Sequence, residues 1–372
     1  MRTALQIRKS PGSSPTVSTI ACATLSLLMT LSGCLASQGS TTTSASDFFS
    51  TQGQVVSKET YPRFETARQM LVGQARAGGV NRFDHKSVLT PTDDQPVVRM
   101  NRDSYYSTGV VDVSEGATVT MPDLPPGMYI SMQPVAEDHR IQPMSYGGGT
   151  FELATHTGTH VYVIVRLDSR FTPEQARSYQ SQMFVTAGSN KPFSCAPVDR
   201  ESFEEVEQQL RAGLFDLIER EGFISVSSTL FSCPTDASRT YYTPEKNQIA
   251  AAIGWGGAQA VDNVYETSPN FPAAGCYEMT FDDPGNRDFW SVTVYDQQGF
   301  MFDDRANVNS HEATANPDGT YTITFGGDPG APNRLPIENE TGEFGVTIRH
   351  YGPSDRIVRD GYRLVPLLKK VD

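Results

Sequence analysis

The amino-acid sequence predicts a mainly β protein with some α. Short segments dense in β-forming residues recur up to position 167 and again from position 276, and turns rich in Pro and Gly separate them. The stretch between these two groups shows helical periodicity instead. Several short strands joined by such turns favour β-sandwiches over a parallel α/β sheet.

The N-terminus has the pattern of a secretory signal peptide. Basic residues within positions 2–9 precede an apolar run at 19–30, which is shorter than the roughly 20 residues that a membrane-spanning helix needs. The run leads into Leu-Ser-Gly-Cys, which resembles a lipobox, where the cysteine sulfur receives a diacylglyceryl group and becomes the new N-terminus. We predict cleavage before Cys34 and its lipidation. An ordinary signal peptide or a short uncleaved anchor are the alternatives.

A lipidated Cys34 would hold the protein at the bacterial cell envelope, because two or more acyl chains anchor a protein firmly. Position 35 is Leu rather than the Asp that usually retains lipoproteins at an inner membrane. The outer membrane is therefore favoured in a cell with two membranes. The Ser/Thr-rich stretch that follows is typical of a flexible tether, and the folded body is expected to begin near Asp47.

Chain length and net charge limit the number of domains and the kinds of partner. A chain of 372 residues is long enough for two domains with cores of their own, at about 150 residues per domain. The formal net charge is −13, and the predicted signal peptide contains basic residues but no acidic ones. Such an acidic body argues against nucleic acid or anionic lipid as the main partner.

The cysteines suggest one disulfide. In an oxidising compartment Cys195 and Cys233 could pair, since they bracket one helical segment, and Cys276 would then be buried at the start of a strand. No two cysteines form a CxxC arrangement, so a zinc or thioredoxin-like site has no support.

The first two helices are predicted from periodicity and capping. Apolar and aromatic residues recur at helical spacing over 57–77, with Pro62 in an early turn. Thr172 and Gln175 form a capping box around Pro173, which predicts a helix that continues to about residue 183.

Two more helices are predicted between the groups of strands. Ser202 repeats the capping device, and an apolar stripe follows it as far as Leu217. Thr243 and Pro244 begin a shorter helix that ends at Gly-Trp-Gly-Gly, residues 254–257. These glycines could lie against a ligand, or they could end the helix while the Trp anchors the junction between domains.

The predicted strands share a high content of β-branched and aromatic residues. They are 97–100, 105–113, 117–121, 128–135, 160–167, 276–281, 288–296, 320–325 and 343–351. In 288–296 the apolar residues Trp290, Val292 and Val294 alternate with Ser291 and Thr293, so one face should pack and the other is more polar.

These elements divide the chain into five parts. The predicted parts are a lipoprotein signal peptide at 1–33, a flexible tether at 34–46, an N-terminal β-sandwich domain at 47–200, a helical connector at 201–257 and a C-terminal β-sandwich domain at 258–372.

One cluster that could carry chemistry lies at the start of a strand. The chain places Asn101, Arg102 and Asp103 directly before Ser104, with Tyr106 close by. An arginine there could bind a carboxylate or phosphate in a bidentate pair, while the tyrosine donates a hydrogen bond or stacks. Alternatively, Arg102 and Asp103 satisfy each other or a neighbouring loop.

A second cluster, Glu137, Asp138 and His139, follows the strand at 128–135. In an extended chain Glu137 and His139 point to one side, so they could bind a divalent metal with further ligands or act as an acid and base pair. The alternative is a hydrogen-bonded polar turn. His156 and His160 could supply two more imidazoles, although the Gly158 between them suggests a turn.

Signatures of common enzymes are absent: the sequence has no GxSxG elbow, HExxH, Walker loop or dinucleotide fingerprint. Ordered motifs instead resemble a known pair of domains. RMNRDSYYSTGVVDV, YISMQPVAEDHRIQPMSYGGGTFEL and GTHVYVIVRLD are similar to the domain of unknown function numbered 1254. IGWGG, DFWSVTVYDQQGFM, NPDGTYTITFGGD, NRLPI and EFGVTIRHYGP are similar to its usual C-terminal companion, the domain of unknown function numbered 1214.

This resemblance implies two consecutive jelly-roll-like β-sandwich domains, with helices at the N-terminus and at the domain junction, that are often oligomeric. It implies no general biochemical function. Two departures bear on any shared active site. Arg140 stands where family members commonly have an aromatic residue, and Lys246, Asn247 and Gln248 stand where they tend to carry Arg and His.

Our leading hypothesis is an envelope-anchored protein that binds a small or glycan-like ligand in a polar cleft of the N-terminal domain. The cleft would be lined by Arg102, Asp103, Tyr106, Asp138 and His139. One alternative is a metal-assisted hydrolase or lyase, in which His139 is the base or a metal ligand and Arg102 holds an anionic group. Another is a structural envelope protein whose polar clusters only support the fold.

Overall fold

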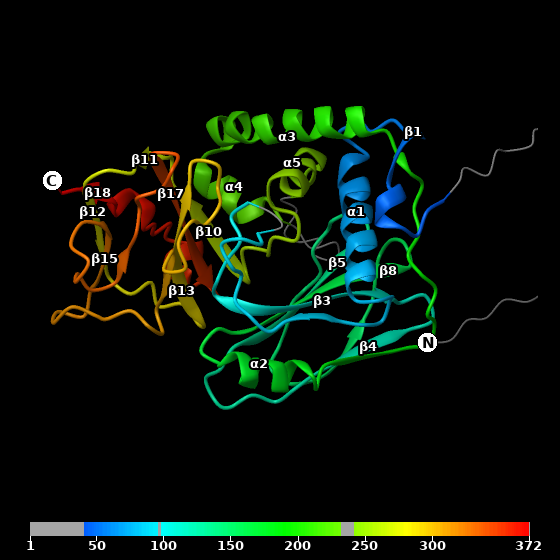
Figure 1. Ribbon diagram of the computed structural model, residues 1–372, viewed down its shortest axis with the longest axis horizontal. Helices are drawn as coiled ribbons and strands as arrows, with labels where there is room; N and C mark the ends of the chain where they lie inside the picture. Colours follow the sequence, from blue (N-terminus) through cyan, green and yellow to red (C-terminus); the bar gives the residue numbers. More distant parts are fainter. Residues whose placement is uncertain (1–40, 96–97, 232–241, 372) are drawn as a thin grey trace, which may run out of the picture. The chain divides into compact units, whose positions relative to one another are not determined.

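The computed structural model of the protein describes residues 41–95, 98–231 and 242–371 (Figure 1). It is a mixed α/β structure with more strand than helix and several antiparallel sheets, as the sequence predicts. Among the described residues, no helix is both long and apolar enough to cross a bilayer.

The first strand group, β2 to β9, forms two antiparallel sheets. The larger has the order β2-β3-β8-β5-β6 and the smaller β7-β4-β9. The strands are β2 Asp84–Lys86, β3 Ser104–Asp112, β4 Ala117–Met121, β5 Ile130–Ala136, β6 Ser145–Tyr146, β7 Gly149–Leu153, β8 His160–Asp168 and β9 Phe184–Ala187.

Strand β8 shows how this group is built, because its side chains alternate between two buried faces. Val161, Val163 and Val165 join a core that includes Val119 of β4 in the smaller sheet. Tyr162 and Ile164 point to the other face and pack in the core formed with the helices. A strand covered on both faces is expected to be almost continuously apolar, which makes the charged residues of β8 exceptional.

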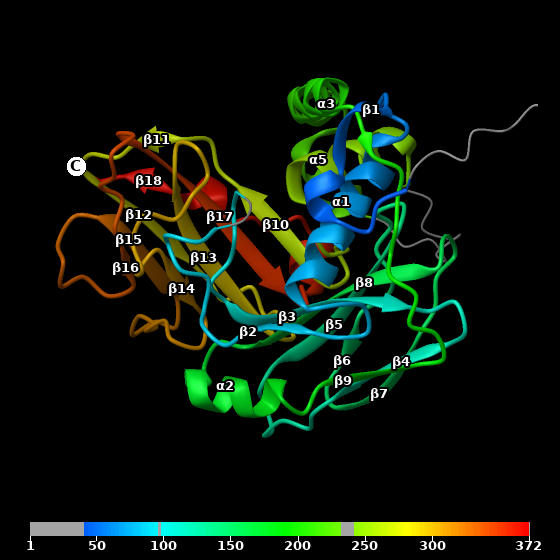
Figure 2. The same cartoon turned by 45° about the vertical axis from the view of Figure 1, so that its right-hand side comes forward.

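Helices cover the second face of the larger sheet (Figures 1 and 2). The covering helices are α1 Tyr61–Arg76, α3 Arg200–Glu221, α4 Phe223–Thr229 and α5 Pro244–Gly254, and the short strand β1 spans Phe49–Gln54. Helix α2 Pro173–Gln180 packs instead in the core between the two sheets, through Ala176. Trp255 follows α5, and its Nε1 donates a hydrogen bond to Thr66 Oγ1 at 3.0 Å. The tryptophan thus ties α5 to α1.

The second strand group, β10 to β18, forms two more sheets. One has the order β10-β17-β13-β14, with β11 also paired to β17, and the other β16-β15-β12-β18, in which β16 runs parallel to β15. The strands are β10 Asn263–Thr267, β11 Phe271–Pro272, β12 Cys276–Phe281, β13 Phe289–Asp296, β14 Asn307–Asn309, β15 Tyr321–Gly326, β16 Arg334–Leu335, β17 Glu343–Tyr351 and β18 Lys369–Lys370.

Strand β13 shows the predicted alternation. Trp290, Val292 and Val294 enter a core shared by both sheets of the second group. The polar face, with Ser291 and Thr293, is equally buried, because residues of the first strand group and of β14 lie against it. Polarity on one face of this strand therefore marks an internal contact and not a solvated surface.

Two local predictions are wrong. The described part of the predicted strand 97–100 is a turn, in which Arg99 has a positive φ of 55°. Helix α3 begins earlier than its predicted cap at Ser202, because the carboxylate of Asp199 accepts the hydrogen bond from Ser202 N at 2.8 Å. The capping box at Thr172 and the cap at Thr243 are confirmed.

Candidate functional site

Asp103 is the centre of a buried cluster that joins the two strand groups. Its Oδ2 accepts hydrogen bonds from Ser291 Oγ at 2.7 Å and from Tyr351 Oη at 3.0 Å. Its Oδ1 accepts one from Asn307 Nδ2 at 2.8 Å. Three neutral donors therefore satisfy this carboxylate, which is 1% exposed.

The two residues before Asp103 also form hydrogen bonds between the two strand groups. Asn101 Nδ2 donates to Tyr351 Oη at 2.8 Å. Arg102 Nη1 donates to the backbone oxygen of Thr90 at 2.7 Å and to Asp304 Oδ1 at 2.9 Å. Arg102 is thus satisfied by neighbouring loops, one of the two arrangements considered from sequence.

A buried arginine on β17 supports the segment that leads to Asp103. Arg349 Nη2 donates to the backbone oxygen of Arg99 at 2.6 Å and to Tyr295 Oη at 3.0 Å, and Nη1 donates to Thr293 Oγ1 at 3.2 Å. Tyr295 Oη in turn donates to the backbone oxygen of Met100 at 2.6 Å. Burial, together with the cation of Arg349, lowers the pKa of Arg99.

Arg166 lies on β8 opposite Tyr106 of β3 and Ser131 of β5. Directly opposite residues share one face of a sheet, and so do residues two positions along a strand, which adds Ser104 and Gln133. We call these five residues the Arg166 site. Ser104 and Ser131 are fully buried, and Tyr106 is partly exposed.

The guanidinium of Arg166 has few partners for a side chain that is 7% exposed. Nη1 donates to Gln133 Oε1 at 2.9 Å, and the ring of Tyr106 lies 5.8 Å from the guanidinium carbon. No carboxylate of a described residue lies within ion-pair distance of it. Ser104 Oγ, on the same face, has no hydrogen-bond partner among the described residues.

The groups that surround Arg166 are mostly neutral phenols. Tyr129 and Tyr351 are close enough to interact with it electrostatically, and burial raises the pKa of both well above the usual range for tyrosine. Both hydroxyls are therefore protonated at neutral pH. A permanently charged guanidinium thus lies mostly among hydroxyl groups. The carboxylate of Asp262 also interacts with it electrostatically, but forms no ion pair with it.

His139 lies in a second buried cluster, next to the turn after α5. Its Nε2 accepts a hydrogen bond from the backbone nitrogen of Gly256 at 3.0 Å, which leaves the proton on Nδ1. Burial lowers the pKa of His139 to about 4. Its backbone φ is +70°, which few residues other than glycine adopt. A neutral, strained and buried histidine is an unusual side chain to retain for packing alone.

Glu137 and Asp138 point to partners other than His139. Asp138 Oδ2 lies 2.7 Å from His156 Nε2, and Glu137 Oε1 accepts hydrogen bonds from the backbone nitrogens of Thr159 and His160. No group of three or more His, Cys, Asp or Glu among the described residues could hold a metal ion. The predicted pair of metal ligands, Glu137 and His139, is therefore not joined by a third ligand in this part of the chain.

Gly256 connects the second cluster to the Arg166 site. Its N–H donates to His139, and its carbonyl oxygen accepts from Gln133 Nε2 at 2.8 Å. Gln133 Oε1 then accepts from Arg166. His139 is thus linked to Arg166 through the backbone of one glycine and the side chain of one glutamine.

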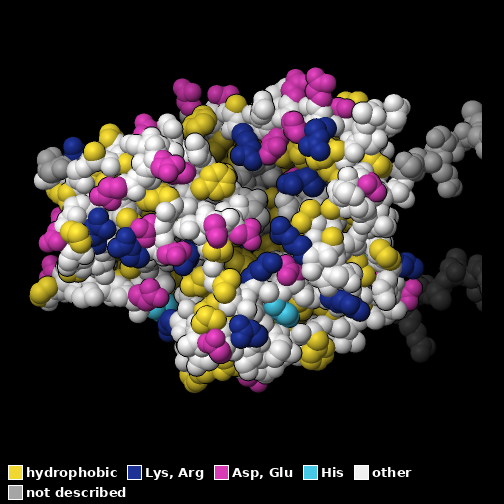
Figure 3. Space-filling view, in the orientation of Figure 1, with side chains coloured by type: hydrophobic (Ala, Val, Ile, Leu, Met, Phe, Trp, Pro, Cys, Tyr) yellow, Lys and Arg dark blue, Asp and Glu magenta, His cyan; other side chains and the backbone are white. Residues whose placement is uncertain are grey.

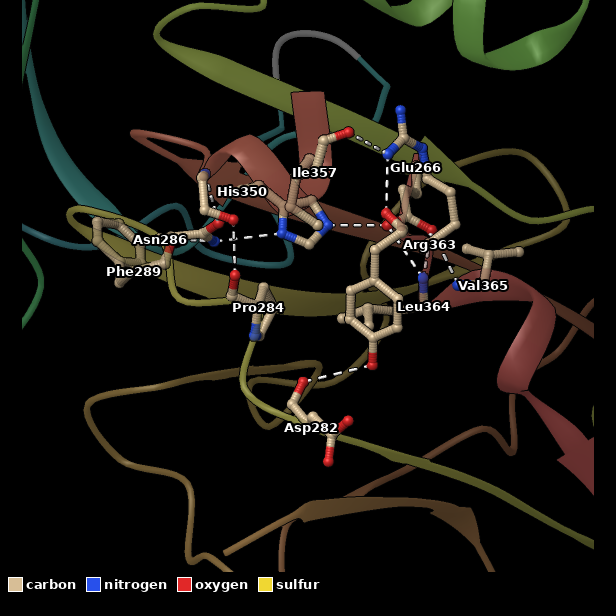
Figure 4. Close-up of polar contacts among 12 residues, drawn as sticks. Glu266, Asp282, Pro284, Asn286, Phe289, His350, Ile357, Arg363, Leu364 and Val365 are labelled. Carbon is tan, nitrogen blue, oxygen red and sulfur yellow. Dashed lines mark hydrogen bonds and ion pairs between the residues drawn. The ribbon is translucent and has the colours of Figure 1, made fainter. Parts of the chain in front are cut away.

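A separate network buries charge in the second strand group (Figure 4). His350 Nε2 lies 2.8 Å from Glu266 Oε1, and Asn286 Nδ2 lies 3.2 Å from the other ring nitrogen, Nδ1. Glu266 also accepts from the backbone nitrogens of Leu364 and Val365, at 2.8 and 2.9 Å. We call these five residues the Glu266 network.

Two predicted cysteine sites lie outside the described residues. Cys34 precedes residue 41 and Cys233 falls within 232–241, so lipidation and the disulfide stay predictions. Cys195 is described, and burial raises the pKa of its thiol to about 11.

Our sequence reasoning did not select Arg166, Gln133 or Tyr351, which link or surround the two clusters. One signal was present, since each lies within a strand segment dominated by apolar residues: HVYVIVRLD, ISMQPVA and EFGVTIRHY. A polar side chain inside such a segment is expected to have a specific partner.

Comparison with known proteins confirms the resemblance noted from sequence. Residues 80–195 match the family model "Protein of unknown function (DUF1254)", and residues 265–355 match "Protein of unknown function (DUF1214)". The chain therefore contains a DUF1254 and a DUF1214 domain, and both families are described as proteins of unknown function. No curated protein matches its sequence.

Among solved structures, the chain is similar to the VPA0106 protein of Vibrio parahaemolyticus. The two share 19% sequence identity with a TM-score of 0.61 over 85% of this chain and 98% of the other. An uncharacterised protein of Burkholderia cenocepacia also matches, at 14% identity and a TM-score of 0.47, over 80% of this chain and 84% of the other. The likeness to VPA0106 shows a shared fold.

Proposed function

We propose that this protein is an envelope-anchored lipoprotein that binds a small anionic ligand at the Arg166 site. The observation that carries the proposal is the state of Arg166, a buried cation whose one hydrogen bond to a described residue goes to the neutral amide of Gln133. A small hydroxylated carboxylate, such as a sugar acid, is the ligand class that fits this chemistry.

Electrostatics supports an anionic ligand. Burying a cation without a counter-charge is unfavourable by several kcal/mol, even after the protein relaxes. Arg166 presents its N–H donors in a planar fork that matches a carboxylate, which would accept two parallel hydrogen bonds. The ligand would form the ion pair that no described carboxylate forms with Arg166.

The hydroxyl groups around Arg166 support a ligand that is also rich in hydroxyls. Ser104 Oγ has no partner among the described residues, and Tyr106 is the partly exposed member of the site. A hydroxyl both donates and accepts, so it can bind a sugar hydroxyl in either direction. In Figure 3, Lys and Arg side chains lie interspersed with Asp and Glu side chains over the face shown.

The proposal also includes the type of fold that each strand group adopts. We take each strand group to be a jelly-roll-like β-sandwich, because in each group a single core receives side chains from both sheets. The position of the ligand would then be the junction between two sandwiches, where ligand sites of multidomain proteins are common.

The enzyme alternative has less support from the geometry. The free lone pair of His139 is used by the Gly256 N–H, so the ring is not placed to accept a proton from a substrate. Arg102, which was to hold an anionic group, is bound by Thr90 and Asp304. The alternative of a purely structural envelope protein does not explain why Arg166 is buried without an ion pair to a described residue.

The proposal is tested by ligand-induced thermal stabilisation of the purified protein. We expect glucuronate to raise the melting temperature and glucose, which lacks the carboxylate, to raise it much less. At 100 times the Kd, binding adds about 2.7 kcal/mol of stability. Arg166→Gln should abolish the shift, and Arg305→Gln, at an exposed site away from Arg166, should keep it. Equal shifts in both variants would reject the Arg166 site.

The anchor is tested separately. Cys34→Ala should release the protein from the membrane fraction, because the acyl chains that hold it would be missing. Unchanged fractionation would contradict the lipoprotein part of the proposal and leave the binding part standing.

A further inference from the structure

A cavity of about 190 Å³ lies on the opposite edge of the helical layer, apart from the Arg166 site. Helix α1 supplies Arg63, Phe64 and Ala67, the turn after β5 supplies Glu137, and the segment before α3 supplies Phe193 and Cys195. This segment runs alongside α1 in Figures 1 and 2, where Gln74 of α1 binds both the N–H and the carbonyl oxygen of Phe193 at 3.0 Å. The wall of the cavity is therefore fixed.

The cavity holds one charge of each sign. Arg63 and Glu137 both line it, yet no ion pair joins Arg63 to a carboxylate of the described residues. Two opposite charges that line one small cavity without pairing leave both available to a third partner. That partner must carry both charges itself.

Glu137 is held in place by its surroundings. Its Oε1 accepts hydrogen bonds from the backbone nitrogens of Thr159 at 2.8 Å and His160 at 3.1 Å. Gly158 has a φ of +69°, and a Cβ at this position would lie 2.0 Å from the carboxyl carbon of Glu137. Only glycine lets the loop approach so closely. No hydrogen bond from a described residue reaches Oε2, so this oxygen remains an acceptor.

The rest of the wall is apolar and limits the ligand's size. Phe64 and Phe193 are 8% and 5% exposed, and they face the cavity together with Ala67. Typical sites for larger ligands measure about 300 to 1,000 Å³. A small molecule with a short apolar group beside its two charged groups would fill this space.

We infer that this cavity binds a small zwitterion, a free α-amino acid with a short apolar side chain. Its carboxylate pairs with Arg63, its ammonium group with Glu137, and its side chain packs against Phe64 and Phe193. This site is independent of the Arg166 site, and the two proposals stand or fall separately.

Calorimetric titration of the full chain with three matched probes tests the inference without any variant. L-alanine carries both charges, propionate lacks the ammonium group and ethylamine lacks the carboxylate. We expect L-alanine to bind at least tenfold more tightly than either analogue. Equal binding of propionate, or no binding of L-alanine at millimolar concentration, would overturn the proposal.

Alkylation of Cys195, in protein kept reduced so that no disulfide to Cys233 forms, then locates the site. The thiol lines the cavity, so a bound ligand should slow its reaction with iodoacetamide several-fold, measured on the Cys195 peptide by mass spectrometry with the Cys276 peptide as reference. Arg63→Gln and Glu137→Gln should each lose this protection, whereas Lys58→Gln, an exposed cation just before α1, should keep it. Protection that survives in both cavity variants would place the amino acid elsewhere.

Discussion

The Glu266 network and the Arg166 site both bury charge, but they do so in opposite ways. Glu266 accepts hydrogen bonds from a histidine ring and two backbone N–H groups, and the histidine's second nitrogen meets an asparagine amide. Arg166 makes one hydrogen bond to a described residue, which it donates to the neutral amide of Gln133. A buried charge with several partners supports the fold, whereas one without an ion pair among the described residues is the better candidate for binding a ligand.

Glu266→Ala should have the largest effect of the changes that test this comparison. The substitution leaves the Leu364 and Val365 N–H groups and the His350 ring buried without their acceptor, and breaking such a buried pair costs about 3–5 kcal/mol. Urea titration would measure the loss in the free energy of unfolding. Glu340→Ala, at an exposed position, should change it by less than about 0.5 kcal/mol. Similar losses of unfolding free energy in the two variants would mean that the buried Glu266 stabilises the fold no more than an exposed glutamate does.

Acid should weaken the fold through His139. Because burial lowers the pKa of His139 to about 4, against about 6.5 in the unfolded chain, the unfolded chain binds a proton that the folded chain does not. This contribution to stability is present above pH 6.5 and is lost as the pH falls towards 4, by about 3 kcal/mol. His139→Asn should flatten the dependence, since asparagine tolerates a positive φ.

The matched control for this experiment is His85→Asn, because His85 is exposed. Urea titrations at pH 4.5 and pH 7.5 compare the three proteins. If His139→Asn loses as much stability in acid as the original chain, another group is responsible for the pH dependence.

Asp103→Asn should have a moderate effect. The amide replaces one carboxylate oxygen by an NH2 group, so at least one of the hydrogen bonds that Ser291, Tyr351 and Asn307 donate loses its acceptor. We expect a loss of about 2 kcal/mol in the free energy of unfolding. Asp304→Asn, whose side chain is exposed, serves as the control and should lose less than about 1 kcal/mol.

Arg166→Met should have the smallest effect on stability, although it removes a buried charge. The loss of the bond to Gln133 is offset by the removal of an uncompensated cation, so the free energy of unfolding should change by no more than about 1 kcal/mol. A loss as large as that of Glu266→Ala would show that Arg166 supports the fold in the same way as Glu266.

Local sequence patterns predicted the helices and strands better than they predicted which residues pack against them. The capping box at Thr172 and the alternation in β13 depend on neighbours a few residues away, and the structure has both. The burial of Ser291 depends on Asp103, which lies far away in the chain. Alternation of apolar and polar residues shows which side chains share one face of a strand, but not which residues cover that face.

The candidate site was predicted only in part for the same reason. Asp103 and His139 were selected because polar residues cluster around each of them in the sequence. Arg166 stands among apolar neighbours, so only the folded sheet places it beside Tyr106 and Gln133. Whether a carboxylate lies within ion-pair distance of Arg166 depends on the folded structure, and residue spacing along the chain does not show it.

The position of Gly256 between His139 and Gln133 has a thermodynamic consequence. If one glycine residue holds both clusters, a ligand that tightens Gln133 against Gly256 also changes the bond from Gly256 to His139. Coupling of this kind is reciprocal, so the free energy by which protonation of His139 alters ligand affinity equals that by which the ligand alters protonation. A ligand bound at Arg166 would therefore be read out as a shift in the titration of a histidine that it never touches.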